Sequence, residues 1–412
     1  MNISEVLIRQ KNELNYIYSQ ELLDREYHID INTDIIKVIT GIRRSGKSTL
    51  ALLSLKDKNF GYVNFDEREL INFNSTDIEK GIKEIYGDTN ILFLDEIQNY
   101  DKWELWVNSL YRRGYNITIT GSNSKLLSKE LSTHLTGRYV SIEIFPFSFK
   151  EILNYKKINL KDIEIDKEKK GKILNILRNY LDTGGFPEVI VKNFGKDYIK
   201  TLFDSIIYKD VLYRYKIRNI EKLHDLARYL IFISSNRFTI NKLYNILNFN
   251  SKVTVERYIE YLKEAYLIFT LRYFSYKEKE RVKYPKKIYI IDNGFITALS
   301  DNYSISRLME NTVFIELYKK YKENFYYLYG NNYEIDFLIK EGNNIKQLIQ
   351  VSYINNYDEI DKREIRSLIK GYNLFKEYNP ELLIITWDYE DTKIIDNVNI
   401  KFIPLYKWLL NI

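Results

Sequence analysis

The chain has 412 residues and no cysteine, which excludes disulfide bonds, thiol nucleophiles and zinc sites with cysteine ligands. It has only three histidines, His28, His134 and His224, and their spacing fits no metal-binding motif. Long apolar runs are missing too: the N-terminal segment carries acids and amides among its apolar residues, and the later apolar runs are only as long as strands. These absences predict a cytoplasmic protein that does not span a membrane.

The composition is that of a folded protein, with 45% hydrophobic and 29% charged residues. A chain of 412 residues is too long for one ordinary core, so two or three domains are expected. The net charge of +6 is a modest excess that indicates a polyanionic partner only where the charges cluster.

The segment 41–49, "GIRRSGKST", follows a β-branched run at 34–40 and precedes a helical pattern at 48–55. A strand, the pattern G-x-x-x-x-G-K-S and a helix together predict a phosphate-binding loop, in which glycines let backbone N–H groups point at phosphates. We expect Lys47 to contact the β and γ phosphates and Ser48 to bind Mg²⁺. The predicted nucleotide-contacting residues are Gly41, Ile42, Arg43, Arg44, Ser45, Gly46, Lys47, Ser48 and Thr49.

The segment 90–100, "NILFLDEIQNY", is a hydrophobic strand that ends in two acids. We predict that Asp95 lies on the magnesium side and that Glu96 is the base that polarises the attacking water. This pair predicts ATP and Mg²⁺ as ligands and favours hydrolysis over phosphoryl transfer to a small metabolite. A buried strand with a polar end is the alternative for this segment taken alone.

Two further polar residues are candidates for catalysis. The strand at 115–122 is followed by Asn123, which could touch the γ phosphate or its water, although a helix cap is an alternative role. Arg138 could stabilise charge on the phosphates in the transition state, within its own subunit or across to a neighbouring one. A surface salt bridge is the alternative for Arg138.

Four segments resemble those of the AAA+ ATPases of archaea and bacteria that precede a winged-helix segment and a nuclease-like C-terminal domain: "GIRRSGKST", "LFLDEIQ", "TGSNSKLLSKELSTHLTGR" and "FPFSFKE". The resemblance covers nearly the whole chain, including "GGFPEVIV" and "KDVLYRY". It implies an α/β protein with a P-loop AAA+ parallel-sheet domain at 1–150, followed by a helical connector at 151–220. It also implies a winged-helix domain at 221–300 and a small α/β, restriction-endonuclease-like domain of the PD-(D/E)XK type at 301–412.

The segment 221–292 reads as three helices followed by a β-hairpin, the order of a winged-helix domain, whose third helix enters a DNA major groove. The predicted wing at 276–287 is rich in lysine and includes Lys286 and Lys287. A protein-binding or purely structural winged helix with a solvated basic loop is the alternative. The candidate DNA contacts are Lys252, Thr254 and Arg257 on the third helix and Lys279, Arg281 and Lys283 in the wing.

The segment 306–387 reads as a helix, three strands, a helix and a strand, and resembles the PD-(D/E)XK nuclease core. That core binds Mg²⁺ through an acid of its first helix, an acid of its second strand and an E-x-K pair on its third strand. Glu310 and Asp336 match, but the third strand has Gln350 and Ser352 in place of the glutamate and lysine. These losses predict a degenerate, silent site; residual Mg²⁺-dependent cleavage through Glu310, Glu316 and Asp336 is the alternative.

Together these features predict an ATP-hydrolysing switch that associates with DNA. The alternatives are a nucleotide-gated scaffold that binds protein partners with negligible hydrolysis, and an ATP-dependent nuclease. Assembly into an oligomer is compatible with each of them.

Overall fold

The computed structural model describes residues 2–20, 22–122, 135, 137–160 and 166–412. The chain divides into two compact units, one of residues 1–147 with 264–266 and one of residues 148–263 with 267–412. Apart from residues 264–266, the second unit contains all three segments for which we predict separate domains beyond residue 150, so those boundaries stay predictions. Among the described helices, none combines the length and the apolar character that crossing a bilayer requires.

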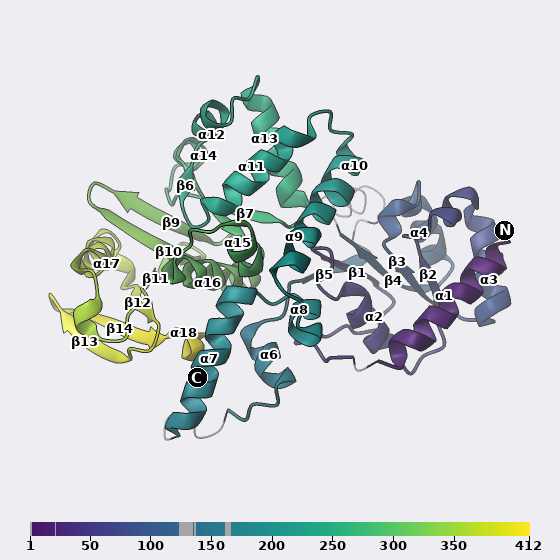
Figure 1. Cartoon of the computed structure of the whole chain (residues 1–412), viewed down its shortest axis with the longest axis horizontal. Coiled ribbons are helices and arrows are strands. Elements are labelled where there is room, and N and C mark those ends of the chain that lie inside the picture. Colours follow the sequence, from purple (N-terminus) through teal and green to yellow (C-terminus); the bar gives the residue numbers. More distant parts are fainter. Residues whose placement is uncertain (1, 21, 123–134, 136, 161–165) are drawn as a thin grey trace. The chain divides into compact units, whose positions relative to one another are not determined.

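The first unit is built on a five-stranded sheet in the order β2-β3-β4-β1-β5, and all of its strand pairs are parallel (Figure 1). Every residue of β1 is buried, as expected for a central strand of a parallel sheet with helices around it. The strands are β1 (Ile36–Gly41), β2 (Gly61–Asn64), β3 (Ile91–Asp95), β4 (Asn116–Gly121) and β5 (Tyr139–Ile144). The helices are α1 (Ile3–Tyr18), α2 (Lys47–Leu55), α3 (Ser75–Tyr86) and α4 (Trp103–Arg112).

The register of the parallel strands brings the polar ends of three of them to one edge of the sheet. Thr40 of β1 pairs with Gly121 of β4, and Leu94 of β3 pairs with Ile119 of β4. The phosphate-binding loop, Asp95 and the end of β4 therefore lie side by side, as the ligand-binding edge of an open α/β sheet requires. Buried aliphatic side chains such as Val38, Leu94 and Ile119 pack beneath this edge.

The second unit begins with a mainly helical region followed by a three-stranded antiparallel sheet in the order β6-β8-β7. The helix α9 runs directly into a π-helical turn at Ile206–Leu212. The segment we predicted as a wing contains a short helix, α14, instead of a continuous hairpin loop. The helices are α6 (Phe149–Tyr155), α7 (Lys167–Thr183), α8 (Pro187–Lys192), α9 (Lys196–Ser205), α10 (Tyr213–Tyr215), α11 (Ile220–Phe232), α12 (Ile240–Ile246), α13 (Lys252–Glu264), α14 (Glu278–Lys283) and α15 (Asn293–Leu299). The strands are β6 (Arg237–Phe238), β7 (Ile268–Leu271) and β8 (Lys286–Ile290).

A mixed six-stranded sheet in the order β13-β14-β12-β11-β10-β9 follows, and α17 packs against β10 and β11 (Figure 1). The elements expected from 306 to 387 are present, and a further hairpin and helix lie beyond them. The strands are β9 (Phe325–Gly330), β10 (Tyr333–Glu341), β11 (Asn344–Val351), β12 (Glu381–Thr386), β13 (Asp391–Ile395) and β14 (Val398–Pro404). The helices are α16 (Ile305–Tyr321), α17 (Lys362–Leu374) and α18 (Leu405–Leu410).

The two sheets of the second unit are joined by backbone contacts. After β7 the chain runs alongside β9, where the Phe274 N–H donates to Tyr327 O at 2.8 Å and the Tyr327 N–H donates to Arg272 O at 3.1 Å. The ring of Phe274 is buried in the core of the six-stranded sheet. The predicted wing is therefore anchored to the C-terminal sheet at its base.

A buried carboxylate ties the glycine pair at 184–185 to the chain after β8. Asp292 accepts hydrogen bonds from the Gly185 N–H at 2.7 Å and from the Gly294 N–H at 2.8 Å. Gly184 has φ +77°, and a Cβ placed on it would lie 1.7 Å from Asp292 Oδ1. Only glycine fits there, because both the backbone conformation and the space exclude a side chain.

Candidate active site

The loop between β1 and α2 has the backbone conformation that a phosphate-binding loop needs. Gly41 has φ +148° and a Cβ there would lie 2.2 Å from Ile144 O, while Gly46 has φ +91°. Arg44 also adopts a positive φ, of 66°. These conformations curl the loop over the start of α2, whose first N–H groups carry the positive end of the helix dipole.

The side chains of the loop turn toward the sheet edge. Lys47 is 4% exposed; its Nζ donates to Ile42 O at 3.1 Å and lies 3.7 Å from Glu96 Oε1. Within the described part of the chain, Ser45 Oγ is buried and has no hydrogen-bond partner. A buried ammonium and an unsatisfied buried hydroxyl inside a glycine-rich curl fit a bound phosphate chain, which would accept from both.

Asp95 is held at the end of β3 by hydroxyl groups. Ser48 Oγ donates to Asp95 Oδ1 at 2.9 Å, Thr120 Oγ1 donates to the same oxygen, and Tyr62 Oη donates to Asp95 Oδ2 at 3.3 Å. Burial and, second to it, the neighbouring charge of Glu96 raise the pKa of Asp95 to about 6. The pairing of Ser48 with Asp95 matches the pair that we predicted as Mg²⁺ ligands, and two oxygen donors side by side suit that ion.

Glu96 lies in a strained turn directly after the strand. Its φ of 49° and ψ of 42° are left-handed, which is uncommon for a residue with a side chain. Its N–H donates to Thr120 Oγ1 at 2.9 Å, and Gln98 Nε2 donates to its Oε2 at 2.5 Å. The turn thus keeps the carboxylate of Glu96 beside Lys47, with Oε1 3.7 Å from Nζ.

Sequence reasoning missed Thr120, Tyr62 and Gln98. Thr120 bridges Asp95 and Glu96, which makes it the residue that couples the two acids. A threonine two residues before the end of a β-branched strand carries no motif of its own. The one signal was the register of parallel strands, which places the end of β4 next to the end of β3.

The other predicted site residues lie in different places. Arg43 is mostly buried, with Nη1 4.0 Å from Asp66 Oδ2, and Thr49 lies in the first turn of α2. Asn123 falls outside the described residues.

Arg138 precedes β5, whose first residue pairs with Ile36 at the start of β1, so roughly 17 Å of strand separates Arg138 from the phosphate-binding loop of its own chain. Arg138 is exposed and donates from Nη1 to Asn108 Oδ1 at 2.9 Å. A role at the phosphates of its own subunit does not agree with this position, because the arginine lies at the opposite edge of the sheet. Its action on the nucleotide of a neighbouring subunit stays a prediction.

The candidate DNA contacts divide into exposed and engaged residues. Lys252 and Arg257 are exposed on α13, Thr254 is half-buried there, and Lys279 and Lys283 are exposed on α14. Arg281 differs: it donates to Ser275 O, pairs with Glu278 at 3.1 Å and lies over the ring of Tyr326. Arg281 is therefore already engaged within the chain, and its contact with DNA stays a prediction.

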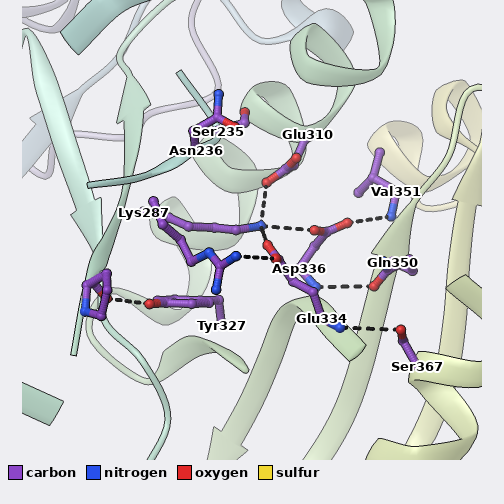
Figure 2. A network of polar contacts seen from close by, with 12 residues as sticks. Ser235, Asn236, Lys287, Glu310, Tyr327, Glu334, Asp336, Gln350, Val351 and Ser367 are labelled. Atoms are coloured by element: carbon purple, nitrogen blue, oxygen red, sulfur yellow. Dashed lines mark hydrogen bonds and ion pairs between the residues drawn. The ribbon is translucent and has the colours of Figure 1, made fainter. Parts of the chain in front are cut away.

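The structure brings Glu310, Asp336 and Gln350 together, as their predicted positions required. Gln350 Oε1 accepts from the Asp336 N–H at 3.2 Å, and Asp336 Oδ2 accepts from the Val351 N–H at 3.1 Å. Lys287, which we assigned to the basic wing, lies in this cluster instead, with its Nζ 3.0 Å from Asp336 Oδ1 and 3.1 Å from Glu310 Oε1 (Figure 2). The wing assignment of Lys287 is wrong because alternation along β8 turns this side chain inward.

Comparison with known proteins agrees with this site. A family model described as an AAA domain matches residues 33–153, and a model described as a domain of unknown function (DUF8612) matches residues 174–305. An uncharacterized protein of Methanocaldococcus jannaschii, MJ1544, is 38% identical over 95% of this chain and 91% of its own length. An uncharacterized protein of Haemophilus influenzae is 31% identical over 99% of this chain and its whole length, 100%.

The chain therefore belongs to the family of these two proteins, and its first unit is an AAA-type P-loop ATPase domain. Such a domain generally implies binding of ATP and Mg²⁺. Among solved structures, the Walker-type ATPase PABY2304 of Pyrococcus abyssi covers 64% of this chain and 90% of its own at 18% identity, with a TM-score of 0.42.

Proposed function

We propose that this chain is a Mg²⁺-dependent ATP hydrolase in which Glu96 activates the attacking water. The observation that carries the proposal is the position of Glu96 beside Lys47, fixed by the bond from its own N–H to Thr120 Oγ1. Bound Mg²⁺ would neutralise charge on the phosphates. Ser48 and Asp95 would hold it, and the backbone N–H groups after Gly41 would hold the phosphate chain.

Phosphate release tests this proposal directly. Glu96→Gln keeps the size of the side chain but removes its ability to take a proton, so we expect the rate to fall by about 10²- to 10⁴-fold while ATP binding persists. Asp88→Asn, at a side chain that is 88% exposed, is the matched control and should keep the parent rate. Absence of ATP turnover in the parent chain, or an unchanged rate in Glu96→Gln, would refute the assignment.

We also propose that the second unit associates with DNA and that ATP switches this association. Residues 220–290 have the element order of a winged helix, with helix α11, strand β6, helices α12 and α13, and strands β7 and β8. The exposed cations on α13 and α14 favour a nucleic acid. Acids on α13, such as Glu256, lie among them, so the binding should be weak and strongly dependent on salt.

Duplex binding measured at several salt concentrations tests the DNA proposal. Replacing Lys252 and Arg257 by alanine removes two phosphate contacts and should flatten the plot of log affinity against log salt by about 1.8. Lys172→Ala, at an exposed lysine on α7, is the control. An unchanged slope, or no binding at low salt, would contradict the DNA proposal and would favour protein partners as the ligands of this unit.

For the C-terminal sheet we propose a nuclease-like fold without nuclease activity. The order of α16, β9, β10, β11, α17 and β12 supports the resemblance to the PD-(D/E)XK core. Gln350 in place of an acid and Ser352 in place of a lysine remove one metal ligand and the cation beside the attacking water. The domain would then serve as a support for the DNA-associated region.

A further inference from the structure

The most unusual charged group of the second unit is the ammonium of Lys287. The side chain is 2% exposed, and its Nζ lies 2.8 Å from Glu334 Oε1, 3.0 Å from Asp336 Oδ1 and 3.1 Å from Glu310 Oε1 (Figure 2). Lysine is almost never buried to this degree unless it is paired. Here three carboxylates, one for each N–H of the ammonium, saturate its capacity to donate.

These carboxylates come from elements that are distant from Lys287 in the sequence. Glu310 lies on α16, Glu334 and Asp336 lie on β10, and Lys287 enters from β8. Two further donors fix the cluster from behind: Tyr289 Oη donates to Glu310 Oε1 at 2.7 Å, and the Val351 N–H donates to Asp336 Oδ2. The oxygens are thus held in place by groups other than the ammonium that they surround.

The cluster has more negative than positive charge. Besides Lys287, Arg237 has its Nη2 3.6 Å from Glu334 Oε2 and Arg363 also acts on the charge of Glu334, while the buried acid Glu364 interacts with Asp336, so three cations face four acids. Burial disfavours the charge of Lys287, but Glu310, Asp336 and Glu334 outweigh it and hold the pKa of Lys287 well above its ordinary value. Burial, partly offset by Lys287, raises the pKa of Glu310 to about 7.

A compact cation ringed by carboxylate oxygens at about 3 Å is the arrangement of an ammonium, whereas Mg²⁺ or Mn²⁺ needs oxygens at about 2.0–2.2 Å. The described residues contain no group of three or more acids and histidines arranged to hold a metal ion, although three acids meet here. The ammonium of Lys287 lies among these three acids.

We propose that Lys287 is a tethered cation that fills a divalent-cation position among Glu310, Glu334 and Asp336, so that the native chain is closed to metals there and loss of the ammonium opens the site. The inference rests on the contacts of the second unit and not on ATP hydrolysis. It assigns a ligand class to the opened site, a hard divalent ion with oxygen ligands. In the native chain, the ammonium of Lys287 would hold the three carboxylates together, as a bound metal ion would in its place.

Calorimetric titration with Mn²⁺ tests the proposal, with Asp95→Asn present in every variant so that the ATP site contributes nothing. In the chain that keeps Lys287, we expect no Mn²⁺ to bind among the three acids, so adding Asp336→Asn should not change Mn²⁺ binding. With Lys287→Ala, we expect one Mn²⁺ to bind per chain, and we expect that binding to be lost when Asp336→Asn is added. Lys172→Ala, at an exposed lysine of α7, is the matched control and should bind Mn²⁺ as the parent does.

Circular dichroism shows whether each variant folds, so an unfolded variant can be distinguished from a folded variant that binds no Mn²⁺. If Lys287→Ala is unfolded alone, Mn²⁺ must restore its structure, and failure to do so overturns the proposal. A folded Lys287→Ala variant that binds no Mn²⁺ overturns it as well. Mn²⁺ binding by the parent that disappears with Asp336→Asn would show that the ammonium does not close the site.

Discussion

The hydroxyl of Thr120 should decide whether Asp95 is ready to bind Mg²⁺, and Thr120→Val tests this. Valine has nearly the same shape but can neither donate to Asp95 Oδ1 nor accept from the Glu96 N–H. Ser48 and Tyr62 would still donate to Asp95, so the carboxylate would lose one of three hydroxyl partners. The Glu96 N–H would lose its acceptor inside the strained turn.

The size of the effect follows from these contacts. A hydrogen bond to a charged group is worth about 1.5–3 kcal/mol, and 1.4 kcal/mol corresponds to a factor of ten. With two donors remaining, we expect the Mg²⁺ concentration for half-maximal ATP hydrolysis to rise about tenfold. The Thr120 bond also lowers the pKa of Asp95, so without it that pKa should rise above about 6.

The assay is phosphate release as a function of Mg²⁺ concentration between pH 5.5 and about pH 8, a window chosen around the Asp95 pKa. Mg²⁺ binds the ionised carboxylate, so in the parent the half-saturating concentration should rise as the pH falls through about 6, and in Thr120→Val the rise should begin at higher pH. Thr118→Val, a buried neighbour on the same strand, is the control. A folded Thr120→Val chain with the parent's Mg²⁺ dependence at every pH would refute the reasoning.

Three further outcomes follow from the second unit. Gly184→Ala forces a Cβ onto Asp292 and should lower the Tm by roughly 5 °C or more, whereas Gly195→Ala, with open space around it, should change little in the same thermal scan. Burial raises the pKa of Asp292 from 3.8 to about 6, so the folded state holds the extra proton between these values and the free energy of unfolding falls as the pH rises through them. Asp292→Asn should flatten that slope in urea titrations, and an equal slope would contradict the assignment. Plasmid DNA incubated with Mg²⁺ should stay uncut by the parent and by Asp336→Ala alike, and cutting that Asp336→Ala abolishes would show an active nuclease.

The phosphate-binding loop was predictable because its chemistry depends on backbone conformation. Positive φ favours glycine at both Gly41 and Gly46, and the close approach of Ile144 O also excludes a side chain at Gly41, so these constraints leave glycine in the sequence. The positions of Asp95 beside Ser48 and of Glu96 beside Lys47 were predictable for a related reason, since an acidic pair at the end of an apolar strand has few structural uses, while their roles stay predictions. Thr120 could not be found because its role depends on the side chains of a neighbouring strand.

The position of Lys287 could not be predicted from the sequence. The sequence shows a lysine-rich stretch at 276–287, and a run of lysines usually indicates a solvated surface. The partners of Lys287 lie 23 to 49 residues further along the chain and become neighbours only when β8 packs against α16 and β10. The contacts of Arg281 with Ser275 and Tyr326 were equally hidden in the sequence, because they depend on how α14 folds back.

The strand β8 belongs to the small antiparallel sheet, yet its first buried side chain is fastened among acids of α16 and β10. Pulling the hairpin away would leave three buried carboxylates without their ammonium, a far greater penalty than breaking an exposed ion pair. Within the second unit, the three-stranded and six-stranded sheets should therefore move together rather than separately.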